Sequence, residues 1–217
     1  MNTPSPHQEL LASMLMRIRA QGVQDNRILK ALEFVPRQKF LAPEFAEDAF
    51  SSRIFPISCG GYSESVDVLA RLLQQLDVQS HHKILEIGCG SGYTTALFAT
   101  LCEKVHTLDR FETHVSQTTK ALEALTIKNV TVQHADGSMG LPNEGTFDRI
   151  YVSASFHEMP RHFSDHLISG GVMLAPLSIG NGYAKMMRLT KIGSRFERED
   201  LFEVLDSPII KGKAAVL

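Results

Sequence analysis

The chain lacks the features that would direct it to a membrane or to nucleic acid. No apolar run in its 217 residues approaches the roughly 18 residues that a helix needs to span a bilayer. The formal net charge is only −2, and so small a charge creates no field that would attract nucleic acid or an anionic membrane surface. The sequence therefore predicts neither kind of partner.

Cysteine is scarce, and the three cysteines are Cys59, Cys89 and Cys102. An odd number of cysteines without paired spacing argues against a disulfide framework and against a zinc site, so no metal is expected. The segment from Met1 to Gln8 is polar and lacks the basic and then apolar order of a signal peptide. Reduced thiols and the missing signal favour a cytoplasmic location.

What the chain does contain is the composition of a globular protein, with 43% hydrophobic and 21% charged residues. Residues 1–80 show three helical patterns, at 8–20, 26–34 and 65–76, in which apolar side chains recur on one face. We expect these residues to form a helical extension, including the substrate side of the site. A sheet domain is then expected over residues 81–217.

From residue 83 onward, short apolar strands alternate with helical patterns. The expected strands are 83–87, 104–108, 130–134, 147–153 and 172–175. The expected helices are 93–101, 111–125 and 161–167, and a closing antiparallel pair is expected at 186–192 and 201–205. Such alternation is typical of βαβ units and a mainly parallel sheet with helices on both faces. The prediction is an α/β, Rossmann-like sheet with an N-terminal helical extension and a C-terminal antiparallel strand pair.

The most informative stretch is the strand and turn Ile84-Leu85-Glu86-Ile87-Gly88-Cys89-Gly90-Ser91-Gly92. Closely spaced glycines after an apolar strand open the nucleotide pocket of an α/β sheet, because a backbone without Cβ atoms lets a ligand approach. The dinucleotide fingerprint needs its third glycine one residue later, where this chain has Tyr93. Glu86 would also repel a pyrophosphate, whereas it suits the amino group and sulfonium of S-adenosylmethionine. A tight turn without a ligand is the alternative.

Two further acids stand at the ends of the next two strands. Asp109 closes the second strand, where its two oxygens can accept hydrogen bonds from both hydroxyls of a ribose. Asp136 follows the third strand and can meet the adenine amino group, while Gly137 leaves room for the ring. The alternatives are a solvated turn acid at Asp109 and a simple Asp-Gly turn at Asp136. Acids at three successive strand ends favour the cofactor.

Several stretches together are similar to one protein family. They are residues 22–25, 29–31, 35–40, 84–93, 136–140, 147–152, 167–176 and 202–205. The glycine turn alone is shared by many methyltransferases, so the opening segments and residues 167–176 narrow the choice. On these residues the chain resembles the protein-L-isoaspartate (D-aspartate) O-methyltransferases over nearly its whole length.

The resemblance implies a methyltransferase sheet that uses S-adenosylmethionine. The implied reaction moves the methyl group to the α-carboxylate of an isoaspartyl residue in a damaged protein or peptide. The implied cofactor contacts are Glu86, Gly88, Gly90, Asp109 and Asp136, with Asp109 in the place where the family usually has Glu. The expected cofactor site also includes their neighbours Cys89, Arg110 and Gly137.

The chain departs from the family pattern just before the third helix. The family typically carries Gly-Gln-Thr-Ile-Ser-Gln-Pro there, and its Ser and Thr approach the substrate carboxylate. In this chain residues 60–66 are Gly-Gly-Tyr-Ser-Glu-Ser-Val. Glu64 stands in the place of the serine, and a slip by one residue would give that role to Ser63 or Ser65. These three are the candidate catalytic residues.

Glu64 raises a question of charge. An isoaspartyl carboxylate is ionised at neutral pH, so it needs positioning rather than a general base. A second carboxylate about 4 Å away would cost about 4 kcal/mol at an effective dielectric constant near 20. Glu64 in the site would therefore favour a substrate hydroxyl or amine, which must lose a proton to attack. Alternatively, Glu64 points to solvent at the start of the helix, where the helix dipole favours an acid.

Three functions stay open on the sequence alone. The first is an S-adenosylmethionine-dependent O-methyltransferase that acts on isoaspartyl residues. The second is a related methyltransferase with another peptide or a small-molecule acceptor, and the third is a cofactor-binding protein without isoaspartyl activity. The altered residues 60–66 favour the second and third functions, and the rest of the resemblance favours the first.

Overall fold

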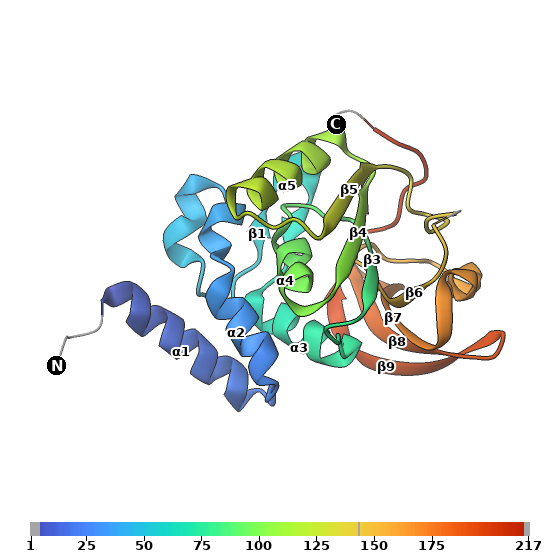
Figure 1. Ribbon diagram of the computed structural model, residues 1–217, viewed down its shortest axis with the longest axis horizontal. Coiled ribbons are helices and arrows are strands. Elements are labelled where there is room, and N and C mark those ends of the chain that lie inside the picture. The colour runs from blue at the N-terminus through green and yellow to red at the C-terminus, as the bar shows by residue number, and fades with distance from the viewer. Residues whose placement is uncertain (1–4, 143, 215–217) are drawn as a thin grey trace.

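The computed structural model describes residues 5–142 and 144–214, so the first four residues of the polar segment Met1–Gln8 lie outside it. Figure 1 shows a twisted sheet beside a group of helices from the first half of the chain. The α-helices are α1 (Pro6–Ala20), α2 (Asn26–Phe34), α3 (Val66–Leu76), α4 (Tyr93–Leu101) and α5 (Glu112–Ala124). Four short 3-10 helices are η1 (Arg37–Phe40), η2 (Pro43–Asp48), η3 (Ser58–Gly60) and η4 (Arg161–His166). None of the helices in the described ranges is long and apolar enough to cross a membrane.

The strands form one small and one large sheet. Strands β1 (Phe55–Pro56) and β2 (Tyr62–Ser63) make the small one. The large sheet contains β3 (Lys83–Ile87), β4 (Lys104–Asp109), β5 (Val130–His134), β6 (Phe147–Val152), β7 (Leu167–Gly180), β8 (Tyr183–Ile192) and β9 (Arg195–Leu205). Its spatial order is β5-β4-β3-β6-β7-β8-β9.

The pairing directions of the large sheet place a ligand site. Strands from β5 through β7 in this order pair in parallel, whereas β8 and β9 each run antiparallel to the strand before. The chain order reverses between β3 and β6, and open α/β sheets bind ligands at the carboxyl ends of the strands at such a point. The predicted α/β fold with closing antiparallel strands is confirmed, and the glycine turn lies at the expected edge.

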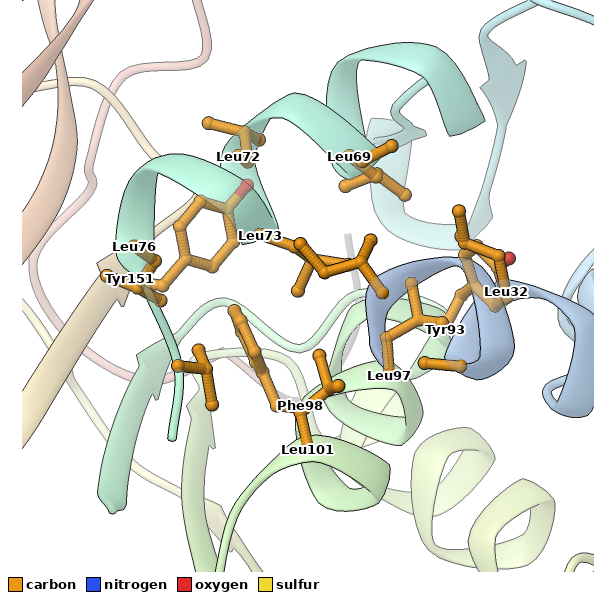
Figure 2. Packing of buried hydrophobic residues seen from close by; sticks show 14 of the residues in the cluster. Leu32, Leu69, Leu72, Leu73, Leu76, Tyr93, Leu97, Phe98, Leu101 and Tyr151 are labelled. Atoms are coloured by element: carbon orange, nitrogen blue, oxygen red, sulfur yellow. The ribbon is translucent and has the colours of Figure 1, made fainter. Parts of the chain in front are cut away.

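Helix α3 connects the N-terminal extension to the sheet. The Ser65 hydroxyl caps it by accepting a hydrogen bond from the Val68 amide at 3.2 Å, which satisfies an amide that the helix itself leaves free. Figure 2 shows its leucines between α2, α4 and Tyr151 of β6. The buried leucines of α3 are Leu69, Leu72, Leu73 and Leu76. They belong to one cluster with residues of the sheet, so the extension and the predicted sheet domain share a continuous core.

The opposite face of the sheet carries a second buried cluster, which contains Leu85 and Ile87 of β3 and Met173 of β7. Loops and η4 cover this face, and Phe163 of η4 is fully buried there. The connections from β5 to β6 and from β6 to β7 contain no α-helix in the part of the chain that the structure describes. Helices were expected on both faces of the sheet, but on this face the described residues form only the short helix η4.

The stretch around Gly170 also differs from the prediction. The sequence predicts a helix over 161–167 and a strand over 172–175, whereas the structure has the short η4 followed by a strand of 14 residues. Gly170 and Gly171 lie inside β7, whose pairing with β6 shifts register in this region. Gly170 has a φ of +75°, so the glycine permits an irregularity within a strand instead of separating two elements.

Replacing Leu73 by alanine should destabilise the fold, because Leu73 is only 2% exposed in the first cluster. Loss of a buried leucine side chain costs about 2–5 kcal/mol of unfolding free energy, which urea denaturation measures. Leu10→Ala is the matched control, since Leu10 is 51% exposed on α1 and its replacement should change stability by less than about 0.5 kcal/mol. Equal losses in the two variants would contradict the described core.

Candidate active site

A cavity of about 350 Å³ opens at the carboxyl ends of β3 and β4. Four segments line most of it: the glycine turn at 88–91, residues 108–111, residues 59–64 and residues 207–210. The predicted site residues on its wall are Ser63, Glu64, Gly88, Cys89, Gly90, Asp109, Arg110 and Gly137, whereas Ser65, Glu86 and Asp136 are not on it. The fold thus brings most of the predicted residues to one enclosure.

The glycine turn holds a conformation that side chains would forbid. Gly88, Gly90 and Gly92 have φ values of +92°, +53° and +87°, in the left-handed region that glycine enters without strain. A Cβ atom on Gly88 would lie 2.1 Å from the Ser153 hydroxyl oxygen. The Gly88 amide donates to the Leu108 carbonyl at 2.7 Å, which joins the turn to the end of β4. The turn therefore presents bare backbone to the cavity.

Asp109 is held by three hydrogen bonds at the edge of the cavity. Its Oδ1 accepts from the Phe111 amide at 2.9 Å. Its Oδ2 accepts from the Gly90 amide at 3.1 Å and from His114 Nδ1 at 3.1 Å, and the Cys89 thiol approaches at 3.7 Å. Burial alone would raise the pKa of Asp109, but the hydrogen bonds and the His114 charge lower it overall. A carboxylate offers about four acceptor positions, so Oδ1 keeps one for a ligand hydroxyl.

His114 is a site residue that the sequence reasoning missed. It lies in the first turn of α5, is 5% exposed, and its Nε2 is 2.9 Å from the Ser58 carbonyl oxygen. Both ring nitrogens therefore face acceptors, an arrangement that the protonated ring satisfies. Burial lowers the pKa of His114, but the Asp109 partner outweighs burial and raises it. A histidine one helical turn beyond a strand-end acid is the signal that could have found it.

Glu86 lies behind the glycine turn and not on the cavity wall. Its side chain is fully buried, and Oε2 accepts hydrogen bonds from the hydroxyls of Thr95 at 2.5 Å and Thr107 at 2.6 Å. Oε1 has no hydrogen-bond partner among the described residues. Burial raises the pKa of Glu86 to about 7, so the carboxyl is partly protonated at neutral pH. Its direct contact with a cofactor stays a prediction.

Asp136 holds the last described part of the chain, residues 206–214, which we term the tail segment. Its Oδ1 accepts from the Ser138 amide at 2.9 Å, and its Oδ2 accepts from the Gly212 amide at 2.7 Å. Arg110 Nε donates to the Gly212 carbonyl at 3.1 Å. Part of the tail segment thereby forms a wall of the cavity. The contact of Asp136 with adenine stays a prediction, because its oxygens face backbone amides.

The altered residues 60–66 place Glu64 on the cavity wall. Glu64 Oε1 accepts a hydrogen bond from the Ser65 amide at 2.7 Å, and Arg37 Nη2 donates to the Glu64 carbonyl at 2.8 Å. Burial raises the pKa of the Glu64 carboxyl, although the Ser65 amide and Arg37 oppose the rise. Glu64 is therefore half-buried at the cavity wall, and its part in the reaction stays a prediction. Ser63 also lines the cavity, whereas the Ser65 hydroxyl caps α3.

Part of the cavity wall, which includes Leu69 and Leu72 of α3, is mostly apolar, and we term this part the arm. We define the arm by the lining residues Tyr62, Glu64, Leu69, Leu72, Tyr151 and Met186. Tyr151 was not predicted as a site residue, because a tyrosine within a buried strand has the sequence pattern of a core aromatic.

Replacing His114 by glutamine should lower stability within a limited pH range. Stabilisation from a raised histidine pKa is complete below the unfolded value of about 6.5 and is lost as pH rises through the folded pKa. Stabilisation from the lowered pKa of Asp109 is present above about pH 3.9 and is lost as pH falls through the folded pKa.

The free energy of unfolding should therefore differ most between the wild type and His114→Gln from about pH 4 to about pH 6.5. Urea denaturation at several pH values measures this difference. A difference that grows steadily toward alkaline pH would contradict the ion pair.

Comparison with known proteins agrees with this geometry. The chain matches the model of the family described as Protein-L-isoaspartate(D-aspartate) O-methyltransferase over residues 9–214. A protein-L-isoaspartate O-methyltransferase of Rhizobium meliloti is 42% identical over 94% of this chain and 100% of the relative. The corresponding protein of Parvibaculum lavamentivorans is 37% identical over 93% of this chain and 91% of the relative.

A solved structure shows the same fold. It is described as a protein-L-isoaspartate O-methyltransferase of Plasmodium falciparum in complex with S-adenosyl-L-homocysteine, and it matches with a TM-score of 0.77 at 23% identity over 92% of this chain and 97% of that chain. The family match spans the altered residues 60–66 as well as the glycine turn, which favours the isoaspartyl reaction over the two alternative functions. The chain therefore belongs to the protein-L-isoaspartate(D-aspartate) O-methyltransferase family and is an S-adenosylmethionine-dependent methyltransferase.

Proposed function

We propose that this cavity binds S-adenosylmethionine and that methyl transfer to the carboxylate of isoaspartyl residues takes place inside it. One observation carries the proposal: the glycine turn with Asp109 and the residues 60–64 line the same cavity. A donor at the first wall and an acceptor at the second can therefore meet without diffusing through solvent.

The residues of the cavity fit the chemistry of the methyl donor. Asp109 keeps an acceptor position for a ribose hydroxyl, and the side chains of Ile87 and Leu108 add apolar wall for an adenine ring. Behind the turn, Glu86 has a buried oxygen without a partner among the described residues. Its ionised form would attract a cationic ligand even without touching it, because charges act strongly through a medium of low dielectric constant.

The chain's own residues have little covalent chemistry to perform. When bound, S-adenosylmethionine supplies a methyl group on a positively charged sulfur, so attack by a carboxylate oxygen removes both charges. An ionised carboxylate needs no general base, and the gain comes from holding the two partners in line. We assign this positioning to the glycine turn on the donor side and to Ser63 and Glu64 on the acceptor side.

We place the reaction in the cytoplasm, with proteins that contain isoaspartyl residues as substrates. In support, all three cysteines are free in the structure, a state typical of a reducing compartment. That nucleic acids and membranes are not partners stays a prediction from the net charge.

Methyl transfer to an isoaspartyl peptide, measured beside the same peptide with ordinary aspartate, tests the proposed function. Base-labile radiolabel is expected on the isoaspartyl peptide alone. Gly88→Ala should abolish transfer, because its Cβ would collide with Ser153. This variant also serves as the control that shows how much label is retained without catalysis. Binding of S-adenosylhomocysteine without transfer to the isoaspartyl peptide would contradict the proposed acceptor.

Replacing Asp109 by asparagine should weaken the binding of S-adenosylhomocysteine by at least about tenfold. The amide has one acceptor oxygen where the carboxylate has two, and charge-assisted hydrogen bonds are worth about 1.5–3 kcal/mol. Isothermal titration calorimetry measures the dissociation constant. Asp165→Asn is the control, since Asp165 is exposed on η4 and its replacement should leave binding unchanged. Equal affinities for Asp109→Asn and the wild type would contradict the ribose assignment.

A further inference from the structure

The arm of the cavity contains two polar side chains with unused hydrogen-bonding groups. Its other polar side chain, Tyr62, is occupied because its hydroxyl donates to the Leu205 carbonyl at 3.0 Å. The remaining lining of the arm is aliphatic or sulfur-containing. The two unused groups belong to Glu64 and Tyr151, and both lie at the end of the cavity that the proposed function assigns to the acceptor.

Tyr151 is a buried residue whose hydroxyl makes no hydrogen bond with any described residue, and its side chain lines the cavity. Tyr151 is 6% exposed, lines the cavity, and packs its ring edge-on against Phe98 at a centroid distance of 5.7 Å. Figure 2 shows the ring between Leu72, Leu76 and Phe98, with the hydroxyl directed toward α3. Because a phenol can donate one hydrogen bond and this one has no protein acceptor, its donor is available to a ligand in the cavity.

Glu64 lines the same part of the cavity, and its second oxygen is not used within the protein. Its Oε1 accepts from the Ser65 amide, whereas Oε2 makes no hydrogen bond with any described residue. The charge of Glu64 acts on Tyr151 and on Tyr62 and contributes to raising the pKa of both phenols, after the larger effect of their burial. Both side chains line the same cavity of about 350 Å³, so one ligand group inside it can meet both.

Charged groups from several elements face this pair. Arg37 of η1 is 3% exposed and donates to the Glu64 carbonyl. The charge of Glu86 in β3 contributes to raising the pKa of Tyr151, and that of Asp206 in the tail segment contributes to raising the pKa of Tyr62. With further carboxyl groups of the same sign acting on the tyrosines of the arm, an ionised Glu64 disfavours the entry of another carboxylate.

An isoaspartyl carboxylate can enter the arm if one of the two carboxyls carries a proton. Two carboxyl groups that share a buried site do not ionise independently, and one of them keeps the proton. Burial raises the pKa of Glu64, while an α-carboxyl group has an ordinary pKa of about 3.3–3.7. A proton shared by the two groups would therefore reside on Glu64, and the acceptor would stay ionised and nucleophilic.

We propose that neutral Glu64 and Tyr151 form the acceptor subsite, in which both donate hydrogen bonds to the carboxylate of the isoaspartyl residue. This assignment rests on the proposed function. The protonated Oε2 of Glu64 then supplies the O–H donor that a serine supplies at this place in the family pattern. It also removes the repulsion that an ionised Glu64 would exert on the substrate.

The methyl transfer balances with these donors in place. Tyr151 and Glu64 bind one oxygen of the carboxylate, and the other oxygen forms the new bond to the methyl carbon. The carbon–sulfur bond breaks, and its electron pair stays on sulfur. Glu64 and Tyr151 keep their protons throughout, so both act as positioning groups that contact the substrate.

The pH dependence of isoaspartyl methylation by the wild type and by Glu64→Gln tests the subsite. The wild-type kcat/KM should fall toward alkaline pH as Glu64 ionises, because its donor is lost and its charge then repels the acceptor. Glu64→Gln keeps a donor that cannot ionise, so it should retain activity within about fivefold at neutral pH and should lack that part of the fall. Glu86 and His114 titrate in both proteins, so the difference between the two profiles reports Glu64.

Tyr151→Phe provides the second measurement. Loss of one hydrogen bond to a charged group should lower kcat/KM for the isoaspartyl peptide by about tenfold, mainly through a higher KM. The affinity for S-adenosylhomocysteine, measured by calorimetry, should not change, which also shows that the variant is folded. Tyr183→Phe is the matched control, because it also removes a tyrosine hydroxyl, while Tyr183 is 49% exposed on β8 and does not line the cavity.

Four outcomes would overturn one proposal or the other. Parallel profiles for the wild type and Glu64→Gln, or an inactive Glu64→Gln that still binds S-adenosylhomocysteine, would refute the neutral role of Glu64. An unchanged KM for Tyr151→Phe would refute its role as a donor. A wild type that methylates no isoaspartyl peptide at any pH would instead refute the proposed function itself, and the subsite with it.

Discussion

The backbone between β3 and α4 turns through three left-handed glycines, and the positions of the other site groups depend on this turn. Gly88 leaves room for the Ser153 hydroxyl, and a Cβ on Gly92 would lie 2.9 Å from the Thr118 hydroxyl oxygen. The Gly90 amide in turn holds Asp109. A side chain at Gly88 would displace Ser153, which lines the cavity, and all three glycines hold left-handed backbone that other residues rarely adopt, so the turn depends on the absence of Cβ atoms.

The carboxyl groups of the site are stabilised in three different ways. Each of its buried carboxyl groups must avoid an unpaired charge in a medium of low dielectric constant. Asp109 stays ionised because His114 and two amides compensate its charge. Glu86 has a pKa of about 7 and is held by two threonine hydroxyls, and Glu64 in the proposed subsite is neutral. Each carboxyl thereby acquires a different chemical use from its surroundings.

The sequence was sufficient for the parts of the fold that local patterns determine. Apolar periodicity predicted the strands β3, β4 and β5 closely, and glycine spacing predicted the turn, because each depends on neighbours in the chain. The strand β7 was predicted too short, since its passage through Gly170 is decided by pairing with β6 and β8. Helices on the second face were expected from the alternation, although loops and η4 cover it.

The site, too, could be predicted from the sequence only where it depends on local patterns. Asp109 and the glycine turn were expected to line the site because both stand at strand ends, and the topology brings these ends to one edge of the sheet. The direction of Glu64 depends on Arg37 and on the cap of α3, and the importance of Tyr151 depends on a cavity that only tertiary packing creates. His114 could not be recognised without knowing that the Ser58 carbonyl lies opposite its ring.

The tail segment has a kinetic consequence. Its residues beside the cavity belong to no helix, and they are fastened by backbone hydrogen bonds to Asp136, Arg110 and Ser155. A nucleoside bound against such a wall leaves most readily when those hydrogen bonds break together. If the product is bound there, we expect local opening of the tail segment to set how long it stays on the enzyme, and this step, instead of bond making, would then limit turnover.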